Sequence, residues 1–299
     1  MSTQLLKVTK PNSLADMIDA RAARRITQRA GAHNAARGHK MAIFANDLIG
    51  IQINQYGLYE REELDILFNF LSPLAAEFAE GLAFDIGANI GNHALYFAKR
   101  FKAVHAWEPN PSTYELLKFN TQWAGNVTPH PYGLGDAKGR FELIEHPDNL
   151  GGSSIRIGNR SSGQVVPIQV ETLDEQNVAT GDLCFMKIDV EGFEANVLNG
   201  GINTILVRQP LIVFEQHESE FVEGSTASIA ILGARGYRFC WHQTPEVPGS
   251  WLARRIVNLR EMLSGRTHSI ETANVVPPCN HSMLIAVPQR FQQRLGLRG

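Results

Sequence analysis

Residues 82–93 read LAFDIGANIGNH, and this stretch decides the fold class. Residues 82–86 suit a buried strand, residues 87–91 suit a tight turn, and the residues after them suit the start of a helix. Gly87 lets the turn tighten, and Gly91 lets the backbone approach a ligand closely. Because open α/β sheets bind ligands at the carboxyl ends of their strands, we expect a ligand site here, with the helix amides facing an anionic group.

Apolar runs that suit strands alternate with helical patterns along the rest of the chain. Further strands are predicted at 103–107, 127–131, 183–188, 211–215, 237–241 and 283–287, and helices at 93–100, 112–121 and 194–206. Strands that are apolar throughout and separated by helices are typical of a parallel sheet covered on both faces. The sequence therefore predicts a doubly wound, mostly parallel, seven-stranded α/β sheet of Rossmann-like type. Residues 141–144 and 165–170 predict an antiparallel insertion around a Gly-Ser loop at 149–154.

Residues 1–75 are expected to form an N-terminal helical extension. The first forty residues are rich in Ala and Arg, and we expect a solvated, partly frayed helix interrupted at Gly31; an arm that touches a partner or an anionic substrate is the alternative. Residues 41–53 predict a short hairpin, and a helix is expected between Gly57 and Pro73. Residues 76–245 would then form the ligand-binding core, and residues 246–299 would complete the sheet and shape the substrate site.

The composition narrows the class of partner. The 299 residues include 28 Lys and Arg against 30 Asp and Glu, a formal net charge of -2, so no basic surplus points to a nucleic acid. Cys184, Cys240 and Cys279 have no metal-ligand or disulfide spacing. No apolar stretch approaches the roughly 18 residues of a membrane span, and the first residues lack a secretory apolar core. We therefore expect a reducing, cytoplasmic setting; the oligomeric state is open.

Two residues of the turn indicate which ligand it binds. A dinucleotide fingerprint needs glycine where this chain has Asn89, and Asp85 at the strand end would repel a diphosphate. S-adenosylmethionine carries an ammonium and a sulfonium, which an acidic group favours. A capping or turn role is the alternative for Asp85.

Two further carboxylates follow at the ends of the next predicted strands. Glu108 lies about twenty residues beyond the turn, where an acidic side chain accepts both ribose hydroxyls. Considered alone it would be a surface carboxylate, but the spacing favours the ribose role. Asp136 could flank the adenine, or it could only belong to a β-turn with Lys138 and Gly139, and the sequence leaves these alternatives equal.

The acceptor side should lie at the ends of the fourth and fifth core strands. Asp189 and Glu191 follow an apolar strand and would point to one side by period-two geometry, with Lys187 as a neighbouring countercharge. One of them could take the acceptor proton, or both could only order the loop and the next helix. His217, after the fifth strand, has a suitable pKa for a base. A metal site that adds Glu215 is chemically possible, but no spacing requires one, so we expect no metal.

These motifs together resemble the FkbM-type methyltransferases. The likeness spans roughly residues 55–240 and rests on the segments 56–60, 84–93, 107–111, 186–194 and 198–215. It implies methyl transfer from S-adenosylmethionine, often to a hydroxyl of a sugar or a polyketide-like metabolite. The family's frequent Ala-Phe-Glu-Pro has Trp107 in place of Phe here, a conservative change. The residues that the likeness implies for the methionine part and the loop beside it are Asp85, Gly87, Asn89, Gly91 and Asn92, with Glu108 for the ribose.

The resemblance implies O-methylation of a small-molecule or glycan acceptor. The candidate catalytic residues, from their positions at the strand ends, are Asp189, Glu191 and His217. Two other functions are compatible with the same type of sheet. A nicotinamide-dependent oxidoreductase would also use a ribose carboxylate, although Asn89 and Asp85 count against it. A non-catalytic nucleoside-binding module that scaffolds a biosynthetic complex is the second.

Overall fold

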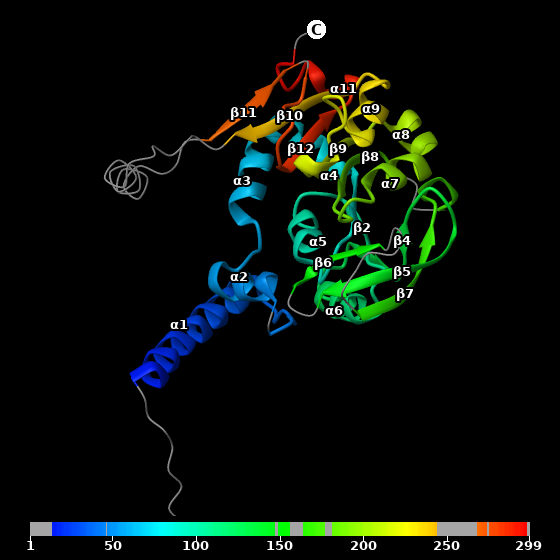
Figure 1. Cartoon of the computed structure of the whole chain (residues 1–299). Helices are drawn as coiled ribbons and strands as arrows, with labels where there is room; N and C mark the ends of the chain where they lie inside the picture. Colours follow the sequence, from blue (N-terminus) through cyan, green and yellow to red (C-terminus); the bar gives the residue numbers. More distant parts are fainter. Residues whose placement is uncertain are drawn as a thin grey trace, which may run out of the picture. The chain divides into compact units, whose positions relative to one another are not determined.

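The computed structural model describes residues 14–45, 47–146, 149–155, 164–176, 181–243, 268–273 and 275–297. The chain divides into two compact units, Met1–Tyr59 and Glu60–Gly299 (Figure 1). The division falls after Tyr59 rather than near residue 75, because the helix predicted after Gly57 belongs to the second unit. No helix of the described ranges is long and apolar enough to cross a membrane.

The first unit contains two helices, α1 (Leu14–Arg37) and α2 (Leu48–Tyr56). α1 buries no residue, as expected of a solvated helix, but it continues through Gly31 without a break. The hairpin predicted at 41–53 was wrong. Ile49 and Ile53 are both buried at helical spacing, and Gly57 ends α2 in the left-handed conformation, so helical periodicity prevails over the strand preference of the isoleucines.

The second unit is built on an eight-stranded sheet in the order β11-β10-β12-β9-β8-β1-β2-β3. The strands are β1 (Leu82–Ile86), β2 (Ala103–Trp107), β3 (Val127–His130), β8 (Leu183–Ile188), β9 (Leu211–Gln216), β10 (Arg238–Gln243), β11 (Ser269–Thr272) and β12 (His281–Val287). β9, β8, β1, β2 and β3 are parallel, and β12 is antiparallel to both β9 and β10. The predicted doubly wound fold is confirmed, with β11 as an additional edge strand (Figure 1).

The chain leaves β1 toward β2 and β3 and later returns to the other side of β1 through β8 and β9. The strand order therefore reverses between β1 and β8, and at this point, at the carboxyl ends of the strands, such sheets have their ligand-binding crevice. β1 and β8 are buried along their whole length. The register places Asp85 opposite Lys187, which brings the cofactor turn and the predicted acceptor residues to one place.

The helices of the second unit connect these strands. They are α3 (Arg61–Phe70), α4 (Ala75–Glu80), α5 (Asn92–Phe97), α6 (Pro111–Thr121), α7 (Glu194–Gly200), α8 (Ile202–Arg208), α9 (Ala227–Gly233) and α11 (Gln289–Gln292), with 3-10 turns η1 (Ser72–Leu74), η2 (Leu173–Glu175) and η3 (Glu218–Glu220). The helix predicted at 194–206 is two helices, because the chain turns at Gly201, where a Cβ would stand 2.8 Å from Leu173 Cδ2.

A second, four-stranded sheet has the order β4-β7-β5-β6. It contains β4 (Gly133–Leu134), β5 (Gly139–His146), β6 (Asn149–Ile155) and β7 (Gln164–Glu171). The predicted antiparallel insertion is confirmed in the pairing of β5 with β7. The Gly-Ser run predicted as a loop is instead strand β6, because pairing with β5 overrides the low strand propensity of glycine.

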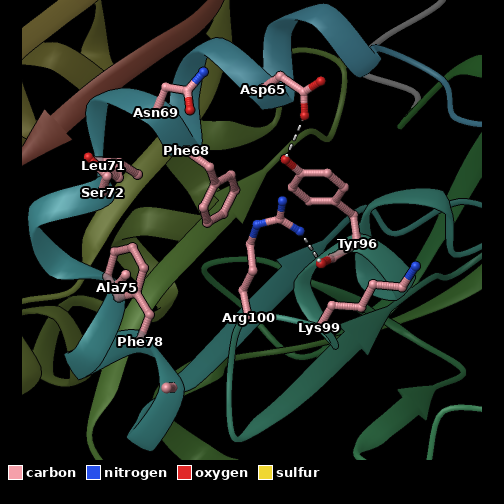
Figure 2. Close-up of a pocket in the computed structure, with 11 residues that line it drawn as sticks. Asp65, Phe68, Asn69, Leu71, Ser72, Ala75, Phe78, Tyr96, Lys99 and Arg100 are labelled. Atoms are coloured by element: carbon pink, nitrogen blue, oxygen red, sulfur yellow. Dashed lines mark hydrogen bonds between the residues drawn. The ribbon is translucent and has the colours of Figure 1, made fainter.

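A cavity of about 610 Å³ lies between α3, α4 and the end of α5 (Figure 2). Within it, Tyr96 donates a hydrogen bond to Asp65 at 3.1 Å, and the Arg100 guanidinium lies over the Tyr96 ring at 3.6 Å. Phe78 and Arg100 precede the first residues of β1 and β2, so this cavity lies beside the amino ends of those strands. It is therefore separate from the carboxyl-end crevice.

Candidate functional site at the carboxyl ends of β1 and β8

The turn after β1 is fixed by backbone contacts to its neighbours on both sides. The amides of Gly87 and Ala88 donate to the Trp107 carbonyl at 3.0 and 2.9 Å. Gly87 has φ 82°, and a Cβ on it would stand 1.8 Å from the Asp189 carbonyl oxygen. Only glycine therefore allows the turn after β1 to touch the turn after β8.

Asn89 and Gly91 shape the rest of the turn. Asn89 has φ 49°, and its side-chain oxygen accepts the Ile90 amide at 2.7 Å. Gly91 has φ 89°, and its open side faces Leu117 Cδ1, which a Cβ would approach to 2.9 Å. The glycine is thus needed for its backbone conformation and for packing against α6, a reason different from the close ligand approach expected from the sequence. Asn92, the first residue of α5, is buried.

Glu108 joins the tip of β2 to the cofactor turn. Its Oε2 accepts the Asn89 amide at 3.0 Å and its Oε1 accepts the Asn110 amide at 2.8 Å. Burial raises the pKa of Glu108 to about 7, although both amides favour the charged form. The predicted ribose carboxylate therefore lies beside the turn and also holds the left-handed Asn89 in place.

Asp85 is a fully buried acid with an unmet hydrogen-bonding requirement. Its exposed fraction is 0%, and neither carboxylate oxygen has a partner of good hydrogen-bond geometry among the residues that the structure describes, although the Ala94 amide in α5 favours its charged form. Burial raises the pKa of Asp85, and the charge of Lys187 opposes this shift. An unpartnered buried carboxyl is costly, so the site fits a ligand that brings a cation or a hydrogen-bond donor to Asp85.

Lys187 and Asp189 form an ion pair with an Nζ to Oδ2 distance of 2.7 Å, which confirms Lys187 as the predicted countercharge. Burial alone would lower the pKa of Lys187, but Asp189, Asp85 and Glu60 together raise it above its ordinary value. Burial would raise the pKa of Asp189, yet Lys187 holds it below its usual range. Asp189 is therefore an ionised, well-oriented hydrogen-bond acceptor and a weak base.

Glu191 completes a group of three carboxylates with Asp189 and Glu215, whose oxygens lie within 4.8 Å of one another. Both Asp189 and Glu191 follow the end of β8, and Glu191 has φ 52°, so the turn gathers them and not the predicted strand alternation. Burial, with the charges of Asp189 and Glu215, raises the pKa of Glu191 to about 8. Carboxylates are also ligands for hard cations.

His217 follows β9 at the same edge of the sheet. Its ring accepts the backbone amide of Glu220 in a capping box at η3, so one ring nitrogen is already an acceptor. In the neutral ring the other nitrogen is then a donor. This geometry suits hydrogen-bond donation to an acceptor oxygen better than proton abstraction. Asp136 lies exposed after β4.

Two carboxylates that lie in the segments of family resemblance, but received no role from the sequence, also shape the site. Glu194 Oε1 accepts the amides of Val190 and Gly192, each at 3.2 Å, and so closes the turn that carries Glu191. Glu60 Oε2 lies 3.3 Å from Nε2 of His93, in the first turn of α5. In the sequence, both are acidic residues near a helix start, a pattern that equally suits a helix dipole.

Comparison with known proteins identifies the family. The model of the methyltransferase FkbM domain matches residues 85–239, just over half of the chain. The hexuronic acid methyltransferase AglP of Haloferax volcanii is 32% identical over 127 residues, which cover 42% of this chain and 52% of the relative. The match thus spans about half of that relative's length.

Two solved structures resemble the chain weakly. The FkbM methyltransferase of Methylobacillus flagellatus KT has 17% identity and a TM-score of 0.39, over 91% of this chain and 60% of that one. The S-adenosylmethionine-bound magnesium protoporphyrin IX methyltransferase of Synechocystis PCC 6803 has 8% identity and a TM-score of 0.41, over 94% and 100%. The family-model match covers the turn after β1, the tip of β2 and the residues after β8, and the chain belongs to the FkbM methyltransferase family.

Proposed function

We propose that this protein transfers a methyl group from S-adenosylmethionine to a hydroxyl of a sugar, glycan or other small-molecule acceptor. The observation that carries the proposal is the buried, unpartnered carboxyl of Asp85 at the point where the strand order reverses. A cationic ligand compensates such a group, and a diphosphate does not. The family match supports the same chemistry.

In this proposal the β1 side binds the cofactor. Asp85 receives the cationic methionine end, and Gly87, Asn89, Gly91 and Asn92 shape the turn around it. Glu108 accepts the ribose hydroxyls while it still holds the Asn89 amide, since each carboxylate oxygen has two lone pairs. The exposed Asp136 remains a proposed neighbour of the adenine.

The β8 side then receives the acceptor. The bound cofactor supplies a methyl group already activated by its sulfonium. Asp189, fixed by Lys187, accepts a hydrogen bond from a neighbouring hydroxyl of the acceptor and so orients the reacting one. Glu191, with a pKa of about 8, takes the hydroxyl proton as the new oxygen–carbon bond forms, because a base with a pKa near the working pH is most effective. His217 donates a hydrogen bond to a neighbouring acceptor oxygen. We propose no metal in this step.

The acceptor class is proposed from the hexuronic acid methyltransferase relative and from the hydroxyl chemistry of the site. The net charge of -2 and the carboxylates near the acceptor position make a polyanionic nucleic acid an unfavourable partner.

Calorimetry with S-adenosylhomocysteine and with NAD tests the cofactor. We expect saturable binding of the homocysteine nucleoside and none of NAD; the opposite result would end the proposal. Label transfer from methyl-labelled S-adenosylmethionine to a panel of sugars, uronic acids and hydroxylated metabolites then tests the acceptor. Label found on nitrogen instead of oxygen would refute O-methylation while leaving the cofactor assignment intact.

A further inference from the structure

Glu60 is a strained residue whose side chain reaches into the candidate site. It precedes α3 with φ 53° and ψ 39°, a left-handed conformation that is unfavourable for glutamate. Its Oε2 lies 3.3 Å from His93 Nε2, and the exposed fractions of the two side chains are 30% and 8%. A costly backbone conformation that places a charged group against a buried imidazole is typical of a functional site.

The carboxylate of Glu60 also acts on the buried ammonium of Lys187. Burial raises the pKa of Glu60, but His93 and Lys187 outweigh this effect and hold it below its ordinary value. Lys187 already forms its ion pair with Asp189 and lies opposite Asp85 in the β1–β8 register. Glu60 is thus a third acid whose charge favours the protonated form of Lys187, and it lies just before α3 instead of at the end of a strand.

This arrangement leaves the Asp85 carboxyl able to bind a cationic ligand. The buried Lys187 ammonium bonds to Asp189 at 2.7 Å and lies opposite Asp85, whose carboxylate oxygens have no hydrogen bond to it among the described residues. Through His93, Glu60 also contacts the first turn of α5, the helix that follows the cofactor turn. Removing the Glu60 charge would draw Lys187 toward Asp85 and release His93.

We propose that Glu60 is a positioning residue of the methyl-transfer site, which holds His93 and the first turn of α5 and keeps Lys187 from neutralising Asp85. The ligand in this proposal rests on the proposed function, whereas the hold of Glu60 on His93 and α5 does not depend on it. Cofactor affinity then depends on Glu60, a residue outside the sheet.

Glu223 provides a matched control. It is exposed, it also has left-handed backbone with φ 52°, and it lies in a turn between Val222 and Ser225. Asparagine adopts this conformation more readily than glutamate, so Glu60→Asn and Glu223→Asn should both keep or raise the melting temperature. If Glu60 only forms a turn, the two variants will also bind S-adenosylhomocysteine equally well, and that result would overturn the proposal. We expect Glu60→Asn to weaken binding about tenfold and Glu223→Asn to leave it unchanged.

Two measurements separate a charge effect from a loss of structure. Glu60→Gln, which keeps the shape of the side chain, should weaken binding of S-adenosylmethionine more than that of S-adenosylhomocysteine, since only the former carries the sulfonium charge. Glu60→Asp, which keeps the charge, should restore the wild-type ratio of the two affinities. Unchanged binding of both ligands in Glu60→Gln would contradict the electrostatic role.

Amide hydrogen exchange tests the hold on α5 without any ligand. The Leu95 amide donates to the Gly91 carbonyl at 3.0 Å in the first turn of α5, and its exchange should accelerate about tenfold in Glu60→Gln but not in Glu223→Asn. Unchanged exchange would refute the contact through His93. If wild-type protein bound neither nucleoside, the proposed function would fail, and the exchange result would still decide whether Glu60 positions α5.

Discussion

Replacing Glu108 by Gln changes one charge at the point where the cofactor turn meets β2. The wild-type carboxylate accepts two backbone amides, from Asn89 at 3.0 Å and from Asn110 at 2.8 Å. Gln has one acceptor oxygen, so one of these buried donors faces an NH2 group, at a cost of about 1–3 kcal/mol in folding stability. The proposed bonds to the ribose also lose their ionic character. Since hydrogen bonds to charged groups contribute about 1.5–3 kcal/mol and neutral ones about half, we expect affinity for S-adenosylhomocysteine to fall about 10- to 100-fold.

The same variant changes the pH dependence of binding. The pKa of Glu108 is about 7 in the free protein, because burial disfavours its charge. Ribose hydroxyls donate to the ionised carboxylate, so binding approaches its full strength about one pH unit above 7 and weakens as the pH falls through 7. Between pH 8 and pH 6 the ionised fraction of such a group falls about tenfold, and the dissociation constant should rise by the same factor. Glu108→Gln cannot titrate and should lose this contribution.

Isothermal titration calorimetry at pH 6, 7 and 8 provides the measurement, with the exposed Glu115→Gln on α6 as the control. Circular dichroism establishes that each variant is folded. Affinity within twofold of wild type at pH 8, or an unchanged pH dependence in Glu108→Gln, would show that this carboxylate does not contact the ribose.

Three further predictions concern the two turns. Asp189→Asn should lower turnover by about 10²-fold or more and lower cofactor affinity far less, through the Lys187 ammonium that it frees beside Asp85, and wild-type turnover would remove Asp189 as the acceptor anchor. With saturating cofactor, kcat/KM for the acceptor should rise with pH toward a plateau above about 8, where Glu191 loses its proton. Glu191→Gln should abolish that rise; if kcat/KM of this variant still rose with pH, another residue would be the base. Gly87→Ala should be far more destabilising than Gly224→Ala in thermal melts, because both have φ 82° but only the Gly87 Cβ would meet backbone; equal losses would attribute the effect to φ alone, about 1–2 kcal/mol.

The central strands could be predicted from the sequence because they are buried over almost their whole length. β1, β2 and β8 have the predicted limits, since each is an apolar run that ends at a turn or at a polar residue. The prediction failed where tertiary contacts outweigh local preference. Residues 149–155 form a strand because β5 is present to pair with them, and the isoleucines of residues 48–56 favour a strand in isolation although their spacing suits the observed helix.

Part of the candidate site could likewise be predicted from the sequence, and part could not. Asp85 and Glu108 follow from spacing, because the carboxyl ends of adjacent parallel strands must lie together. The contact between Glu60 and His93 does not, because it joins two helices whose relative placement depends on packing and not on register. Likewise, the pairing of Glu194 with two amides of the preceding turn becomes visible only when the backbone path is known.

Backbone strain occurs both at site residues that the sequence predicted and at those that it did not. Among the described residues, five that are not glycine have left-handed backbone, and three of them are Glu60, Asn89 and Glu191. Each such position costs on the order of 1 kcal/mol or more, which the surrounding contacts must offset. Glu108 provides that compensation for Asn89, Glu194 for the Glu191 turn, and His93 for Glu60. The carboxylates around the crevice therefore have two tasks, since the same charges that would face the cofactor and acceptor also hold the turns that present them. Substitutions that remove charge should then impair binding and local order together, whereas Glu60→Asn, which removes the charge but also relieves the backbone strain, should weaken binding without lowering stability.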